Sequence, residues 1–202
     1  MATTHALAGA VLGTLVFLVA PDVGVVAVAA AAFGGLFPDF DLYAGHRKTL
    51  HFPVYFSALA VPATVLALAV PTTPSVAVAL FLAGAALHSV MDAFGGGLEL
   101  KPWQGTSDRA VYDHFRGRWV PPRRWIRYDG APEDLLLAGA FAALPLAVFD
   151  GPVQSAVVVA LAVSAVYALL RKPLVAVAER VVAALPTHVL DRLPERFVED
   201  LR

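Results

Sequence analysis

The feature that most constrains the fold is a series of six apolar stretches. They occupy residues 4–20, 22–37, 52–70, 75–95, 134–149 and 153–170. Three approach the roughly 20 residues that a helix needs to cross a hydrocarbon core of about 30 Å, and three are shorter. Proline or glycine stands in the breaks after the first, third and fifth stretches, where it ends a helix and allows a tight reversal. The sequence therefore predicts an all-α, polytopic membrane bundle of about six apolar helices in three hairpins.

The composition supports a membrane protein and excludes other classes. Hydrophobic residues make up 58% of the chain and charged residues only 15%, too few to cover the surface of a soluble domain of this size. The net charge of −1 lacks the basic excess typical of nucleic-acid binding, so no nucleic-acid partner is expected. Because the chain has no cysteine, any metal must be held by nitrogen and oxygen ligands.

The distribution of charge predicts the topology. If each stretch crosses the membrane once, the segments 38–51, 96–133 and 171–202 fall on the same side as the N-terminus. All 15 Lys and Arg residues lie on that side, and the opposite reversals carry only Asp22 and Asp150. The positive-inside rule makes the basic side cytoplasmic. We therefore expect a multi-pass plasma-membrane protein with cytoplasmic termini, composed of an embedded domain (1–170) and an amphipathic, surface-helical tail (171–202).

The segment 96–133 is both basic and aromatic. It carries seven Lys and Arg residues and all three Trp residues. This pattern favours an interfacial belt at the level of the lipid headgroups over a lid that binds a headgroup or substrate. Glu133 and Asp134 fall in the first turn of the fifth helix, where acidic side chains are expected to cap it. Gly9 and Gly13 are expected to serve packing within the chain.

Histidines and aspartates gather near the helix ends on the basic side. His88 and Asp92 are four residues apart, so they share one face of a helix. Asp39 and Asp41 follow Pro38 in a segment expected to be extended, with both carboxylates pointing the same way. The candidate metal ligands are His5, Asp39, Asp41, His46, His51, His88 and Asp92.

This ligand set indicates the kind of metal. Imidazole and carboxylate without thiolate suit zinc first, with manganese or iron as alternatives. The set exceeds what one tetrahedral ion needs, so one or two ions are expected, as in many phosphoester hydrolases. Single histidines at helix ends usually only form hydrogen bonds, which is the interpretation for His114 and His188. His46 stands beside Arg47 and could instead support the ligands. The clustered residues favour a site because ionisable groups at membrane depth are costly.

In these residues the sequence resembles the YdjM-type, DUF457-like family of membrane-bound metal-dependent hydrolases. The resemblance covers about residues 1–105. One departure is Leu50-His51-Phe52, where the family tends to have Thr-His-Ser, so the histidine is kept without its hydroxyl neighbours. The matching elements are Thr4-His5, the segment 36–41, His46-Arg47 with His51, His88-Ser89 with Asp92, and Pro102-Trp103.

The resemblance implies a function. The family is distantly similar to zinc-dependent phospholipase C and P1-type nucleases, which implies a metal-dependent hydrolase with Asp39 and Asp41 as catalytic carboxylates, one of them bridging two ions. The implied substrate is a small-molecule or lipid phosphoester at the cytoplasmic membrane face, and membrane lipid is the expected partner. Two alternatives remain open: a transporter or ion pathway that uses the same groups, and a non-catalytic membrane protein with a structural metal. The sequence predicts no oligomeric state.

Overall fold

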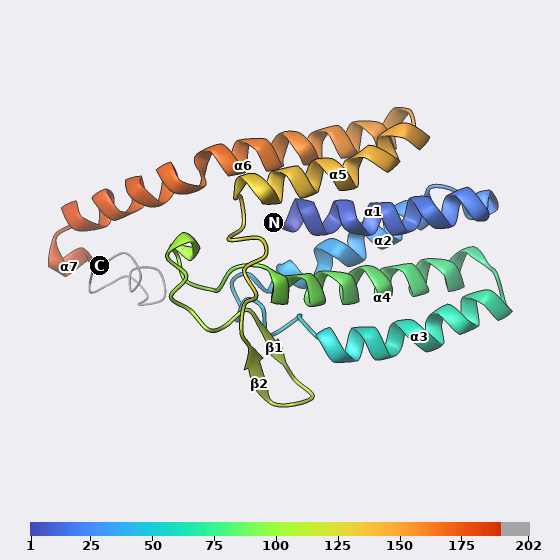
Figure 1. The fold of residues 1–202 in the computed structure, drawn as a ribbon, viewed down its shortest axis with the longest axis horizontal. Coiled ribbons are helices and arrows are strands. Elements are labelled where there is room, and N and C mark those ends of the chain that lie inside the picture. The colour runs from blue at the N-terminus through green and yellow to red at the C-terminus, as the bar shows by residue number, and fades with distance from the viewer. Residues whose placement is uncertain (191–202) are drawn as a thin grey trace.

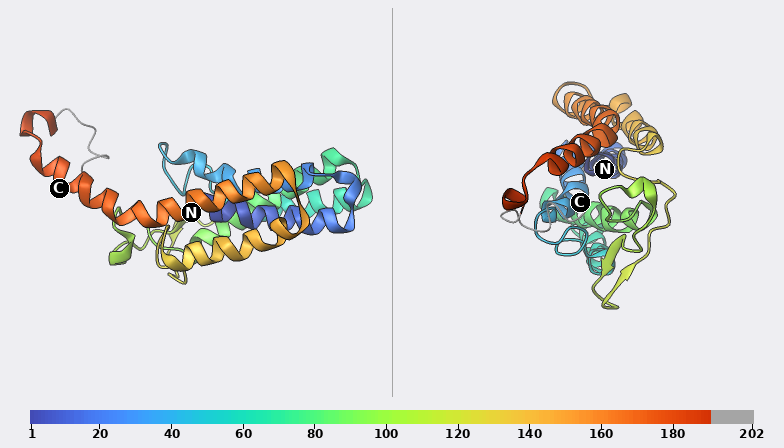
Figure 2. Two further views of the ribbon diagram at one scale, coloured as in Figure 1. Left: turned by 90° about the horizontal axis from the view of Figure 1, so that it is seen from above. Right: turned by 90° about the vertical axis from the view of Figure 1, so that its left-hand side faces the viewer.

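The computed structural model describes residues 1–190 and is mostly helical, as the sequence predicts. The helices are α1 (Ala2–Val19), α2 (Val26–Leu36), α3 (Pro53–Ala69), α4 (Thr73–Met91), α5 (Pro132–Val148), α6 (Gly151–Ala184) and α7 (Thr187–Leu190). Each of the six apolar stretches forms a helix, and the helices lie side by side in an elongated bundle (Figures 1 and 2). The predicted all-α arrangement of helical hairpins is therefore confirmed.

The helix ends follow from local chemistry. Thr72 caps α4 through a reciprocal pair of hydrogen bonds with Ser75, which satisfies backbone N–H groups of the first turn. Gly151 begins α6 with a φ of 65°, a left-handed conformation that glycine adopts at little cost, and Pro152 follows in the first turn. These residues make the tight reversals at one end of the bundle (Figure 1).

Three helices form the tight part of the bundle. Helix α2 packs between α1 and α4, and α3 lies against α4. Glycines allow this close approach: a Cβ on Gly9 would collide with the backbone of Ala31 in α2, and one on Gly35 with the backbone of His5 in α1. Gly84 of α4 meets the backbone of Ala31 in the same way. The expectation that Gly9 serves packing within the chain is therefore confirmed.

Within residues 1–190, three helical segments are long and apolar enough to cross a membrane. They are Ala2–Val19, Thr73–Phe94 and Gly151–Ala184. In the apolar window of α6 only 11% of the residues are buried, although its mean hydropathy is 2.2. Such an exposed apolar surface is compatible with insertion into a bilayer. Helix α3 is apolar but shorter, with 17 residues.

Two features differ from the predicted boundaries. Helix α6 continues through residue 170 to Ala184 without a break, so the expected division between bundle and tail does not coincide with a helix end. The part of that tail from 191 onward lies outside the described residues. The segment 96–133 contains a small antiparallel hairpin, β1 (Val111–Asp113) and β2 (Arg118–Val120), which the sequence analysis did not predict.

The polar segments gather at one end of the bundle. Figure 1 shows the N-terminus, the segment after α2 and the hairpin at the end opposite to the helix reversals. Three 3₁₀ turns lie there: η2 (Phe37–Asp41), η3 (Asp92–Phe94) and η4 (Pro102–Gln104). This arrangement brings together the candidate ligands from distant parts of the sequence.

Candidate metal centre

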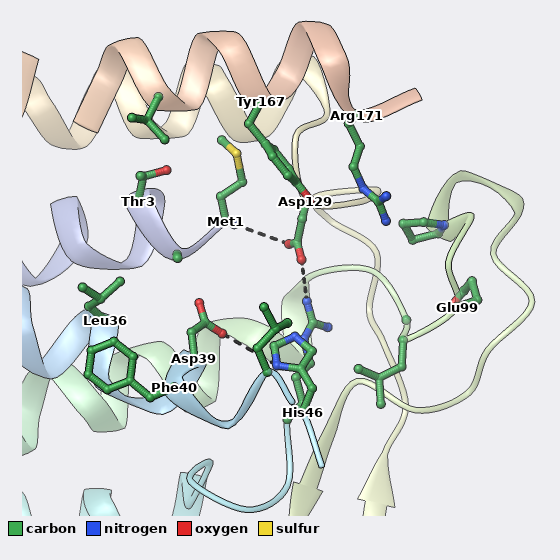
Figure 3. Close-up of a pocket in the computed structure, with 17 residues that line it drawn as sticks. Met1, Thr3, Leu36, Asp39, Phe40, His46, Glu99, Asp129, Tyr167 and Arg171 are labelled. Carbon is green, nitrogen blue, oxygen red and sulfur yellow. Dashed lines mark hydrogen bonds and ion pairs between the residues drawn. The ribbon is translucent and has the colours of Figure 1, made fainter. Parts of the chain in front are cut away.

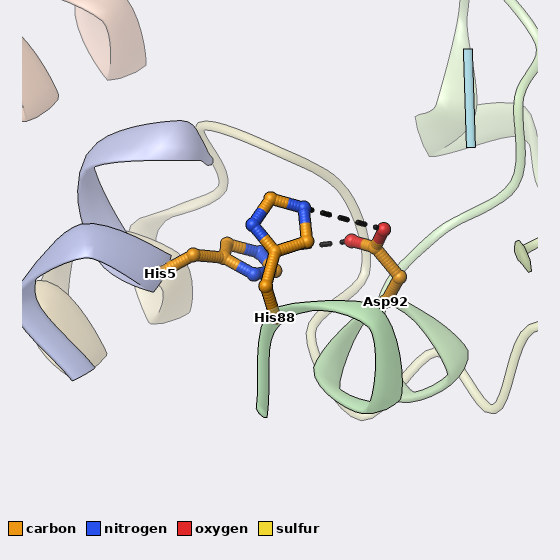
Figure 4. A group of neighbouring side chains, drawn as sticks. All are labelled: His5, His88 and Asp92. Atoms are coloured by element: carbon orange, nitrogen blue, oxygen red, sulfur yellow. Dashed lines mark ion pairs between the residues drawn. The ribbon is translucent and has the colours of Figure 1, made fainter. Parts of the chain in front are cut away.

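Four separate segments supply the residues of the site. His5 lies in the second turn of α1, Asp39 and Asp41 lie in η2, and His51 precedes α3. His88 lies in the last turn of α4, and Asp92 begins η3. Figure 4 shows His5 reaching from α1 toward His88 and Asp92. Two overlapping groups have spacing suited to a metal ion, and they share His88: His5, His88 and Asp92; and Asp39, His51 and His88.

The second group is compact enough for a single ion. The Nε2 atoms of His51 and His88 are 3.1 Å apart. The Oδ1 atom of Asp39 is 3.4 Å from His88 Nε2 and 3.8 Å from His51 Nε2. Ligands held tetrahedrally at zinc distances of about 2.0–2.1 Å are separated from one another by about 3.4 Å. The three separations scatter around that value, so the spacing of these atoms suits a single ion.

The other nitrogen of each ring fixes its orientation. His88 Nδ1 is 2.6 Å from the carbonyl oxygen of Gly35, and His51 Nδ1 is 3.0 Å from Asp41 Oδ2. A carbonyl oxygen and a carboxylate both accept, so each Nδ1 donates its hydrogen. In the neutral rings that metal binding requires, both Nε2 atoms then carry lone pairs that face each other in a buried space. A cation between them removes this repulsion, and such outer partners are typical of metal-ligating histidines.

The two carboxylate oxygens of Asp92 approach different histidines. Its Oδ2 atom lies 3.1 Å from His51 Nε2 and 3.6 Å from His88 Nε2, yet it makes no well-aligned hydrogen bond within the described chain. Its Oδ1 atom lies 3.6 Å from His5 Nε2. The Nδ1 atom of His5 is likewise buried without a hydrogen-bond partner among residues 1–190. Buried polar atoms without partners are uncommon, and here they fit a bound ion.

Asp41 plays a different part from the one that its spacing predicts. The segment after Pro38 is a 3₁₀ turn, so the prediction of an extended segment is wrong, although the carboxylates of Asp39 and Asp41 both approach His46 and His51. Asp39 contributes to the compact group, whereas Asp41 belongs to neither group. Asp41 accepts hydrogen bonds from His51, from His46 and from the backbone N–H of Leu50. It therefore positions histidines.

The charges of this region favour a cation. Burial raises the pKa of Asp41, but the hydrogen bonds from His46 and His51 outweigh it and hold that pKa well below its usual range. Burial lowers the pKa of His51, but the hydrogen bond to Asp41 and the negative charge of nearby Asp92 outweigh it and raise the pKa to about 9. The carboxylates thus stabilise positive charge at His51, whether it is brought by a proton or by a metal ion.

Arg47 is a site residue that the sequence analysis did not propose. It is only 3% exposed and has a φ of 58°, which is strained for a residue other than glycine. Its guanidinium donates to the carbonyl oxygen of Gly96 and to Asp129, and its Nε lies 3.8 Å from Asp92 Oδ2. The pKa of Asp129 is held below its usual range against burial by the N-terminal amine and by Arg47. The sequence contains one indication of this role: Arg47 directly follows the candidate ligand His46.

A pocket of about 470 Å³ opens beside the metal centre (Figure 3). Asp39, His46 and Arg47 line one side. Apolar residues from the ends of α1 and α2 and from α6 line the other, together with Tyr167 and Arg171. His46 is partly exposed here and bonds through Nδ1 to Asp41 at 3.2 Å. The pocket gives an outside molecule access to the candidate ligand Asp39.

The remaining polar residues do not join the centre. His114 bonds to the backbone carbonyl of Lys48, in agreement with a simple hydrogen-bonding role. The side chain of His188 is outside what the structure describes. Glu133 and Asp134 lie in the first turn of α5, as predicted, and the N-cap residue is Ala131, whose side chain makes no cap hydrogen bond. Glu133 pairs with Arg127, and buried Asp134 accepts hydrogen bonds from Thr4 and from the backbone of Gly130.

The structure thus brings together His5, Asp39, His51, His88 and Asp92. Asp41 and His46 adjoin this set, because Asp41 hydrogen-bonds to both His51 and His46. A buried histidine and aspartate group that could hold a metal ion is present. Comparisons with protein-family models, with curated proteins and with solved structures give no match to this chain.

Proposed function

We propose that this chain is a multi-pass membrane protein that hydrolyses a phosphoester at a metal centre on its cytoplasmic face, in keeping with its resemblance to the YdjM-type family. The observation that carries the proposal is the pair of Nε2 atoms of His51 and His88, 3.1 Å apart, with both Nδ1 atoms engaged. Such a pair beside the carboxylate of Asp39 is suited to a divalent ion.

Zinc is the ion that suits this ligand set best. Nitrogen and carboxylate oxygen atoms in a compact group of three match the ligands of catalytic zinc sites, which leave one position for water or substrate. When bound, such an ion supplies Lewis acidity toward a phosphoryl oxygen and toward water. The second group, which includes His5 and Asp92, supports a second ion. Manganese or iron remain alternatives because both accept the same ligand types.

The chain's own residues supply the rest of the chemistry. Since His46 Nδ1 donates to Asp41, its Nε2 is free to accept a proton from an attacking water molecule in the pocket. Arg47 lines the same pocket, where its guanidinium is paired with Asp129 and offsets the negative charge of the nearby carboxylates. In the reaction the water oxygen bonds to phosphorus and the phosphorus–oxygen bond to the alcohol breaks. The departing alcohol takes up a proton, for which protonated His46 is the donor.

The position of the centre supports a membrane enzyme more than a transporter. Its ionisable groups collect at the end of the bundle that holds the polar segments, and none of them belongs to the helix reversals at the other end. A transport pathway would need groups accessible from both ends. A purely structural metal would have a closed coordination shell, whereas Asp39 lines an open pocket.

Elemental analysis of detergent-purified protein tests the metal. We expect about one or two equivalents of zinc, manganese or iron in the wild type and a loss of most of it in His88→Ala. The matched control is His114→Ala, a histidine outside both ligand groups, which should keep the metal. Absence of bound metal from carefully prepared wild-type protein would contradict the proposal.

Hydrolysis of para-nitrophenyl phosphate then tests the reaction. Asp39→Asn keeps the size of the side chain but weakens its binding to a cation, so we expect turnover to fall by about 100-fold or more. If Asp39→Asn and the wild type release nitrophenol equally, the activity does not arise at this centre.

A further inference from the structure

A second pocket lies on the same three helices as the pocket beside the metal centre. It has a volume of about 320 Å³ and is lined only by alanine, valine, leucine and proline side chains from α1, α2 and α6. We call it the apolar groove. Its floor includes Ala6 and Ala10 of α1, and its walls include Ala29 of α2 and Ala156 of α6. Its small side chains leave room for another molecule.

The apolar groove begins where the first pocket ends. On each of the three helices, the last residue of the first pocket and the first residue of the groove are three or four positions apart, which is one helical turn. These pairs are Thr3 and Ala6 in α1, Leu36 and Ala32 in α2, and Val163 and Ala160 in α6. Together the two pockets run along α6 from Arg171 to Pro152, about 28 Å at 1.5 Å per residue.

The two ends of this channel differ in polarity. The groove end offers only apolar contacts, whereas the other end holds charged side chains, namely those of Arg47, Arg171, Asp39, Glu99 and Asp129. The Nε atom of Arg171 is buried and has no hydrogen-bond partner among the described residues, while its terminal nitrogen donates to the carbonyl oxygen of Leu100. Arg171 therefore keeps an unused donor at the polar end, where a phosphate would accept from it.

From this arrangement the geometry points to the occupant: a phosphate esterified to one long alkyl or isoprenoid chain. The chain lies in the apolar groove between α2 and α6, and the phosphate lies in the first pocket between Arg171 and the metal centre. The inference rests on the proposed function for what happens to the phosphoester, but binding of the lipid is a separate property. Only 11% of the residues in the apolar window of α6 are buried, so a chain can enter sideways from a surrounding bilayer.

Binding of hexadecylphosphonate to the full chain in detergent tests the groove. The carbon–phosphorus bond of this probe resists hydrolysis, so binding is measured without turnover. Ala156→Phe fills the groove from α6 and Ala29→Phe fills it from α2. Each should weaken binding about tenfold, because the ring displaces about two methylene groups of the chain. The control is Ala162→Phe, an alanine of α6 that is also exposed but lines neither pocket, and it should leave binding unchanged.

The polar end is tested with the neighbouring pair Arg171 and Lys172. Arg171→Gln should weaken binding of hexadecylphosphonate by about tenfold and leave binding of hexadecanol unchanged. Lys172→Gln removes the same charge from a residue that does not line the pocket and should have little effect. Equal losses in both variants would show that charge near the membrane, and not the pocket, holds the phosphonate.

The outcomes separate this inference from the proposed function. If the groove variants and Ala162→Phe bind the probe alike, the groove is filled by ordinary bilayer lipid or by another chain, and the inference is wrong even where para-nitrophenyl phosphate is still hydrolysed. If the groove variants alone lose binding, the inference stands. It stands also when no phosphoester is turned over, a result that would remove only the proposed hydrolysis.

Discussion

The α1–α2–α4 core and helix α6 are both apolar, but the core helices bury their apolar surface against one another, whereas α6 leaves most of its apolar surface exposed. In the apolar windows of α1 and α4, 44% of the residues are buried, against 11% in α6. Glycines at 9, 35 and 84 let the core helices touch backbone to backbone, whereas the groove side of α6 carries alanines that leave space. The core positions the candidate ligands His5 and His88, and α6 forms one wall of a space that another molecule can enter.

This contrast has a physical reason. Metal ligation needs side chains held within fractions of an ångström, and only closely packed backbones provide that. Substrate entry needs a surface that can be occupied without unfolding the protein, and an exposed helix with small side chains provides that. If this division of roles holds, changes in the core should affect the metal site more than changes on the outer face of α6.

Replacing one glycine in the core should cause the largest loss. In Gly35→Leu, the new side chain would collide with the backbone of His5, and it would displace the carbonyl oxygen that accepts from His88. We expect loss of bound metal and of most folded protein, measured by elemental analysis and by size-exclusion chromatography in detergent. Gly139→Leu is the matched control in α5, where a Cβ meets no described atom within 4 Å. If both variants fold and keep the metal equally, close packing does not hold the site.

Removing the metal should destabilise the core next most strongly. A ligand present at about 100 times its dissociation constant stabilises the native state by about 2.7 kcal/mol. Chelation should therefore lower the melting temperature of the wild type by several degrees, measured by differential scanning fluorimetry. In His88→Ala the chelator should change little, because the shared ligand of both groups is already gone. An equal shift in both proteins would place the metal elsewhere.

Asp41→Asn should have an intermediate effect. The asparagine keeps the size of the side chain but removes the carboxylate that accepts from His51 and His46. Loss of such an outer partner commonly costs 10–100-fold in metal affinity, and we expect a decrease of about that size. Competition with a fluorescent zinc chelator measures it. If Asp41→Asn loses metal as completely as His88→Ala, Asp41 is a direct ligand, as the sequence analysis expected.

Particular residues show how far sequence reasoning reached. His88 and Asp92 could be paired from their spacing because a regular helix determines which side chains share a face. Asp39 and Asp41 could not be assigned separate roles, because the turn between them depends on the tertiary contacts of η2 with α2 and α4. Arg47 was missed for a related reason: its partners Gly96 and Asp129 are 49 and 82 residues away in the chain.

The six helices followed from their apolar runs, whereas the hairpin β1–β2 has only three residues in each strand and left no clear period.

The smallest effect is expected where α6 faces outward. Leu169 is 74% exposed, so Leu169→Ala removes contacts with lipid or detergent only and should change the free energy of unfolding by less than about 0.5 kcal/mol. Leu7 of α1 is 2% exposed and packs against Ala138, Ala142 and Val157. There the same truncation leaves a cavity, which typically costs about 2–5 kcal/mol. Thermal unfolding of the two variants in one detergent makes the comparison, because both lose the same atoms. Equal destabilisation would mean that the outer face of α6 is covered by protein, for example a second copy of this chain, and α6 would then not be open to lipid along that face.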